Sequence, residues 1–97
     1  MLVFEGDEIT IGRRDSGRGT DPDVDLSDEL ADPAVSHLHA SIRRDPATGF
    51  FTVIDLGSTN GTTINHDQQP IEPDLGVAIV SGDQLHVGAW TTIRFTV

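Results

Sequence analysis

The chain has 97 residues, enough for one domain, and its 16 acidic and 6 basic residues give a formal charge of -10, which disfavours nucleic acid and anionic membranes as partners. It contains no cysteine, which excludes a disulfide scaffold, a cysteine nucleophile and a thiolate metal site. No apolar run approaches the roughly 18 residues that cross a bilayer, and the N-terminus lacks a signal-peptide pattern, so we expect a cytoplasmic protein without membrane insertion.

Short β-prone segments alternate with turn signals along the whole chain. The predicted strands are, in order, 2–4, 9–11, 24–26, 38–43, 50–54, 62–64, 77–80, 84–87 and 90–97. Polar loops are expected at 13–23 and 27–35, and the only helix candidate, at 27–31, is limited to about one turn by Pro33. Many short strands at this spacing predict an all-β sandwich or barrel.

Three finer expectations follow from the same patterns. The alternation at 38–43 predicts a half-buried strand with its apolar residues on one face. The segments 77–80 and 84–87 flank Ser-Gly-Asp, which favours a hairpin. In the last strand, alternate residues up to Val97 are expected to face the core.

The segment 55–62, Asp-Leu-Gly-Ser-Thr-Asn-Gly-Thr, is dense in turn-forming residues. Asn60 and Gly61 are expected to supply positive backbone dihedrals. Turn geometry does not by itself explain why two hydroxyls and an amide stand together here. Neutral donors held in fixed directions suit an oligoanion or a peptide backbone.

Two more segments place polar side chains where a predicted strand meets a loop. Ser36 and His37 precede the strand that contains His39, and Gly12 ends a strand that delivers Arg13 into the next loop. Arg13, Arg14 and Arg18 fall within six positions, and an acidic protein can still bind an anion at such a local cluster of arginines.

In this order, the blocks resemble the forkhead-associated (FHA) family, whose pattern is Gly-Arg, Ser-Arg-x-His, Asp-x-Gly-Ser-x-Asn-Gly-Thr and a late Gly-Asp. The matching segments are 12–13, 36–39, 55–62 and 82–83, with Ile64-Asn65 as a further match. The resemblance covers about the whole chain. It implies a single domain over residues 1–97, a sandwich of two antiparallel sheets, and binding of phosphothreonine in an extended peptide, with neither enzymatic activity nor a cofactor.

The resemblance also implies roles for individual residues. Arg13, Ser36 and Thr59 would contact the phosphate, and Asn60 would hold the peptide backbone. His37 stands where the family most often has arginine; a neutral imidazole is a single donor there, and a protonated one is a cation. The residues expected to support the binding loops are Gly12, His39, Gly57, Gly61 and Asn65.

The implied partner is a phosphothreonine-containing protein or peptide, such as a Ser/Thr kinase or its substrate. The absence of lysine, with abundant Arg, Ala, Gly and Asp, favours a GC-rich bacterial source. The alternative is an FHA-like interaction domain that binds a folded partner without phosphate.

Other patterns in the same loops suggest different chemistry. Asp21, Asp23 and Asp25 have the spacing that begins a calcium loop, but Leu26 and Asp32 stand where such a loop has Gly and Glu. These acids could also repel an acidic peptide or select a basic one.

Two readings of the histidines also remain open. His37 and His39 could chelate a metal, although no third ligand is marked by spacing. Ser36, His39 and Asp55 could form a hydrolase triad, although the serine lacks a nucleophile-elbow setting.

Overall fold

The computed structural model describes residues 7–15, 17, 19, 21–27 and 32–97, and this part of the chain forms eight strands. They are β1 (Glu8–Gly12), β2 (Val24–Asp25), β3 (Leu38–Arg44), β4 (Phe51–Asp55), β5 (Thr62–Ile64), β6 (Val77–Ile79), β7 (Gln84–Val87) and β8 (Thr91–Arg94). The predicted strand at 2–4 and residues 28–31 of the predicted helical turn lie outside the described residues. Within the described ranges, no helix is long and apolar enough to span a membrane.

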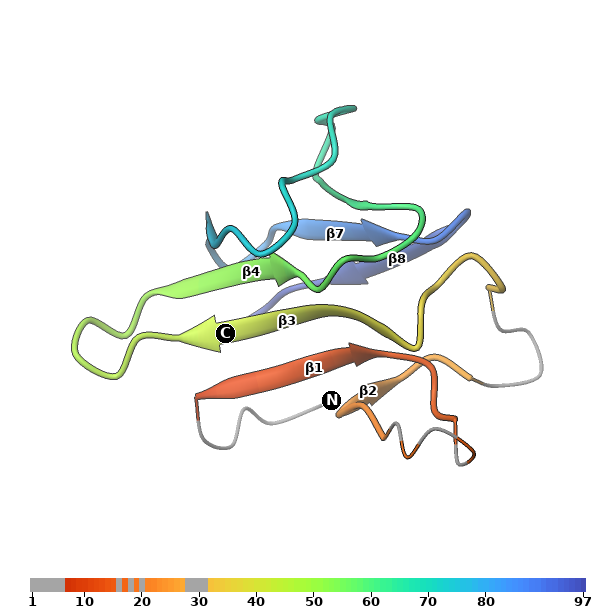
Figure 1. Cartoon of the computed structure of the whole chain (residues 1–97). Coiled ribbons are helices and arrows are strands. Elements are labelled where there is room, and N and C mark those ends of the chain that lie inside the picture. Colours follow the sequence, from red (N-terminus) through yellow and green to blue (C-terminus); the bar gives the residue numbers. More distant parts are fainter. Residues whose placement is uncertain (1–6, 16, 18, 20, 28–31) are drawn as a thin grey trace.

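The strands form two sheets (Figure 1). The larger sheet has the order β2-β1-β3-β4-β6, and the smaller one has the order β5-β7-β8. All neighbouring strands are antiparallel except β1 and β2, which run parallel. The predicted all-β, two-sheet sandwich is therefore confirmed, with this one parallel pair as a difference.

The hydrophobic core is built from both sheets. Ile42 and Val53 come from the larger sheet and Leu85 from the smaller one. Phe95, just after β8, meets Phe51 edge-on with ring centroids 5.0 Å apart. Burying a side chain of this size contributes about 1.5–3 kcal/mol, so the core holds the sheets together and leaves the loops free to carry the site.

The burial of β3 differs from the half-buried strand that we predicted. His39 and Ser41 are fully buried, whereas Leu38 is 51% exposed. Since β3 lies at the centre of the larger sheet, polar groups on it need partners inside the protein. Ser41 Oγ accordingly donates to Glu8 Oε2 at 2.8 Å.

The predicted hairpin around Gly82 is wrong. β6 pairs with β4 in the larger sheet, and β7 pairs with β5 and β8 in the smaller one. The connection crosses between the layers: Gly82 has a φ of 100°, and Asp83 Oδ2 accepts a hydrogen bond from the Val80 amide at 2.8 Å. Local turn chemistry predicted the turn, but not the sheet to which each flanking strand belongs.

The C-terminal strand buries fewer residues than we predicted. Phe95 is buried and Ile93 packs against the core, but Val97 is 68% exposed. β8 ends at Arg94, and the Val97 amide instead donates to Ser81 Oγ at 3.2 Å.

Candidate functional site

A groove of about 560 Å³ opens at one end of the sandwich. Three segments supply its walls: the residue after β1, the segment before β3 and the loop after β4, which meet at the same end of the molecule (Figure 1). The lining residues are Arg13, Pro33, Ala34, Val35, Ser36, His37, Leu38, Gly57, Thr59 and Asn60. The fold thus brings together all five residues expected to bind the ligand.

Arg13 is held in place by the segment that precedes β3. Its amide donates to the His37 carbonyl oxygen at 3.1 Å, and its Nε donates to the carbonyl oxygen of Val35. A Cβ atom on Gly12 would lie 1.9 Å from the His37 oxygen, so only glycine permits this approach. Because these bonds occupy the amide and Nε, the terminal amino groups of the guanidinium remain available to an anion.

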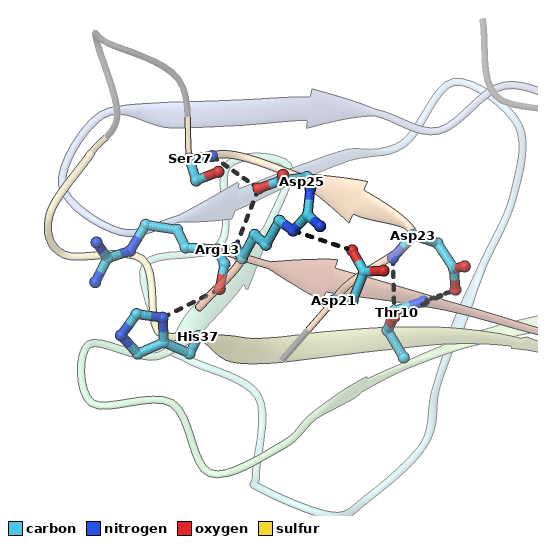
Figure 2. Close-up of polar contacts among 8 residues, drawn as sticks. Thr10, Arg13, Asp21, Asp23, Asp25, Ser27 and His37 are labelled. Atoms are coloured by element: carbon cyan, nitrogen blue, oxygen red, sulfur yellow. Dashed lines mark hydrogen bonds and ion pairs between the residues drawn. The ribbon is translucent and has the colours of Figure 1, made fainter. Parts of the chain in front are cut away.

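His37 lies beside Arg13, and the two side chains extend in the same direction, away from the Asp21–Asp25 group (Figure 2). Nδ1 of His37 lies 3.1 Å from the Arg13 carbonyl oxygen, and Nε2 lies 3.5 Å from Asp15 Oδ2. Both ring nitrogens therefore face oxygen atoms, which hold the imidazole in place beside Arg13.

A chain of hydrogen bonds joins the segment before β3 to the loop after β4. Nδ1 of the buried His39 accepts from the Ser36 amide at 3.1 Å, and Nε2 donates to the Gly61 carbonyl oxygen at 2.9 Å. Ser36 Oγ then accepts from the Thr59 amide at 3.1 Å. Both His39 nitrogens are occupied, so this ring cannot also serve as a metal ligand or a general base.

Asp55 organises the loop after β4. Its Oδ1 accepts from the amides of Gly57 and Ser58, each at 2.8 Å. Its Oδ2 accepts from the hydroxyls of Ser58 at 2.6 Å and Thr62 at 2.8 Å. Burial alone would raise the pKa of Asp55, but the hydrogen bonds from Ser58, Thr62 and Gly57 outweigh it and hold this pKa below its usual value. All four of these bonds are made with residues 57–62, and neither ring nitrogen of His39 is bonded to Asp55. The contacts therefore do not support the alternative triad of Ser36, His39 and Asp55.

The turn geometry of this loop differs in one respect from our prediction. Gly57 and Gly61 have φ values of 82° and 83°, in the region that favours glycine. Among the described non-glycine residues, positive φ occurs at Asn65 and Asp74, so the prediction for Asn60 is wrong. Asn60 instead donates through Nδ2 to the Ala34 carbonyl oxygen at 2.9 Å and braces the opposite wall of the groove.

Asn65 is the predicted loop-supporting residue that the structure does not bring to the groove. It follows β5, where its Nδ2 donates to Asp83 Oδ1 at 3.1 Å and its Oδ1 accepts from the Gln84 amide at 2.8 Å. These contacts join β5 to the start of β7, away from the lining residues.

The acidic residues from the β1–β2 connection to the end of β2 serve separate local contacts (Figure 2). Asp23 Oδ2 accepts from the Thr10 amide at 2.9 Å, and Asp25 Oδ1 accepts from the Arg14 amide at 3.1 Å. Asp21 lies 3.8 Å from the Arg14 guanidinium. In the part of the chain that the structure describes, no three His, Asp or Glu side chains are grouped as metal ligands.

Asp32 has a structural role that we did not predict from the sequence, where it appears only as a position in the calcium-loop spacing. Asp32 is only 2% exposed and joins the loop before β3 to the turn before β8. A local signal for half of this role was present, because Asp followed by Pro and Ala favours an Asx turn, and Oδ1 accepts from the Ala34 amide at 3.0 Å. The other half depends on Trp90, far along the chain, and carries no local signal.

Comparison with known proteins gives the same family as the motifs. The FHA domain family model matches residues 9–88. An oxoglutarate dehydrogenase inhibitor from Corynebacterium diphtheriae is 33% identical over 98 residues, which cover 96% of this chain and 62% of that protein, so the chain spans less than two thirds of this relative.

Two solved structures are similar in fold. An FHA domain from Arabidopsis thaliana has a TM-score of 0.72 and 30% identity, covering 95% of this chain and 70% of its own. An FHA structure described in terms of phosphothreonine-dependent interactions has a TM-score of 0.68 and 29% identity, covering 96% of this chain and 80% of its own.

The Asp55 contacts predict how stability depends on pH. Since the folded-state pKa is lowered, the carboxylate stabilises the fold fully above its unfolded-state pKa, and this contribution is lost as the pH falls through the lower folded value. At pH 7, Asp55→Asn should lower the free energy of unfolding by about 1–3 kcal/mol. Urea unfolding from pH 7 to pH 2.5 should show the gap to the wild type narrowing below about pH 4. A gap that stays constant over this range would contradict the assignment.

Proposed function

The chain belongs to the FHA domain family, and we propose that its groove binds a phosphothreonine residue within an extended peptide. The observation that carries this proposal is the convergence of Arg13, Ser36 and Thr59 on one groove whose described lining residues include no carboxylate. Charged and neutral donors with fixed directions suit a phosphate dianion, because charge-assisted hydrogen bonds are stronger than neutral ones.

Each of these residues has a specific part in the proposed complex. The terminal amino groups of Arg13 supply the cation. Ser36 Oγ already accepts from the Thr59 amide, so its own hydroxyl proton can be donated to a phosphate oxygen. The Thr59 hydroxyl provides a further donor, and Asn60 lies beside these residues, where it would meet the backbone of the bound peptide.

The remaining predicted residues act on the loops and not on the ligand. Gly12, Gly57 and Gly61 permit the close approach and the turns, and His39 joins the two walls. We propose that the module binds and does not catalyse, and that it needs neither a metal nor a cofactor.

The proposed partner is a cytoplasmic protein that carries phosphothreonine, either a Ser/Thr kinase or a kinase substrate. A formal charge of -10 disfavours nucleic acid as a competing ligand. Residues 1–97 would act as one domain in this interaction. The identity of the partner depends on which phosphopeptide the groove selects.

A matched set of three peptides tests the function directly. Peptides of one sequence with phosphothreonine, phosphoserine or threonine should bind in that order of affinity by titration calorimetry. The γ-methyl of phosphothreonine should add about 0.8 kcal/mol over phosphoserine. Equal binding of the unphosphorylated peptide would instead support the phosphate-independent interaction domain.

Arg13→Ala tests the proposed cation. Removing the guanidinium should weaken binding of the phosphothreonine peptide by about 1.5–3 kcal/mol, because a charge-assisted hydrogen bond is lost. Arg14→Ala is the matched control, since that neighbouring side chain is 63% exposed, pairs with Asp21 and does not line the groove. If a folded Arg13→Ala protein bound as tightly as Arg14→Ala, Arg13 would not be the phosphate ligand.

His37→Arg tests the position where this chain departs from the family pattern. A permanent cation at the groove should tighten phosphopeptide binding by about 0.5–1.5 kcal/mol, and His37→Ala should weaken it. His66→Arg adds the same charge on an exposed turn and should have little effect. Equal gains from His37→Arg and His66→Arg would show that only the net charge of the protein matters.

A further inference from the structure

Asp32 is a buried carboxylate that the proposed binding chemistry does not use. Its Oδ2 accepts from the Trp90 amide at 2.8 Å and the Thr91 hydroxyl at 3.1 Å, and its Oδ1 accepts from the Ala34 amide at 3.0 Å. It does not line the groove, so its charge is not presented to a ligand. These bonds connect the segment before β3 to Trp90, which lies 58 positions later in the sequence.

The backbone beside Asp32 carries two carbonyl groups that orient groove side chains. The Ala34 carbonyl oxygen accepts from Asn60 Nδ2 at 2.9 Å, and the Val35 carbonyl oxygen accepts from Arg13 Nε. Asp32 holds the peptide units on both sides of Ala34, because its Oδ1 accepts from the Ala34 amide and its carbonyl oxygen accepts from the Val35 amide at 3.1 Å. The next peptide unit, which carries the Val35 carbonyl, is held by the Ser36 amide, which donates to His39 Nδ1. The Asp32 carboxylate therefore acts on the Asn60 contact through Ala34, and on the Arg13 contact one residue further along the same segment.

Packing leaves this segment little room to move. Gly88, just after β7, approaches so closely that a Cβ there would lie 2.6 Å from Asp32 Oδ2 and 2.7 Å from Val35 Cγ2. Val35 is itself fully buried. The turn between β7 and β8 thus forms a rigid base on which the segment rests.

We propose that Asp32 is a positioning residue of the phosphopeptide groove, anchoring residues 33–36 to the turn before β8 and so fixing the directions of Arg13 and Asn60. The inference rests on the proposed function for its ligand, but the anchoring itself can be measured without one. Replacing the carboxylate by an amide places an NH₂ group among N–H donors, which breaks at least one of these bonds.

The experiment compares Asp32→Asn with Asp83→Asn, measured well below the unfolding temperature of both variants. Asp83 is the matched control because its carboxylate, like that of Asp32, accepts from both a backbone amide and a side chain, but it lies just before β7 and away from the groove. Asp32→Asn should weaken phosphothreonine-peptide binding by about tenfold or more, the effect of losing one charge-assisted bond to phosphate. Asp83→Asn should bind like the wild type although it loses stability too. A folded Asp32→Asn protein with wild-type affinity would overturn the proposal.

Two further measurements keep the test decisive. If Asp32→Asn does not fold, Thr91→Val removes a single donor and should weaken binding about two- to fivefold; unchanged binding would count against the proposal. If the wild type binds no phosphopeptide, the proposed function fails, and amide exchange tests the anchoring alone. Asp32→Asn should then speed exchange at Ala34, at Trp90 and at Thr59, which bonds to Ser36 and not to Asp32. Unchanged exchange at Thr59 would show that Asp32 does not order the groove.

Discussion

His39 is fully buried, and each of its ring nitrogens meets the backbone of a different loop. The bond to the Ser36 amide turns that serine toward the Thr59 amide, and the bond to Gly61 fixes where the second loop returns to the smaller sheet. Without this imidazole, the side-chain hydrogen bonds left between the two walls would be those of Ser36 with Thr59 and of Asn60 with Ala34. The groove is therefore a product of one interior side chain whose two nitrogens play opposite roles, as acceptor and donor.

A chain with a formal charge of -10 offers an unusual setting for an anion. The structure accommodates both the acidic chain and an anion site because two acids near the groove, Asp32 and Asp55, do not line it. Asp32 and Asp55 are buried, and their oxygens collect backbone amides and hydroxyls that the sheets cannot satisfy. The described lining of the groove is left with neutral donors, one arginine and one histidine. Buried carboxylates thus build an anion site without facing the anion.

The sequence predicted the parts of this protein that depend on neighbouring residues. Strand alternation and turn residues predicted the all-β class, and the Gly12-Arg13, Ser36 and 55–62 motifs predicted which loops form the site. The errors in strand pairing and in burial concern contacts between distant residues. Whether β6 and β7 share a sheet depends on β4 and β5, and the burial of Ser41 depends on Glu8, 33 positions earlier. The link from Asp32 to Trp90 spans 58 positions, which no local pattern contains.

The network around Asp55 also has a consequence for the kinetics of binding. Five hydrogen bonds hold this loop in its turn, four to the carboxylate and one from the Gly61 amide to Ser58 Oγ, before any ligand arrives. A peptide that meets donors already in place loses its own freedom on binding, but it does not have to order the protein. Association should then proceed at similar rates for related phosphopeptides, and differences in affinity should appear in the lifetime of the complex.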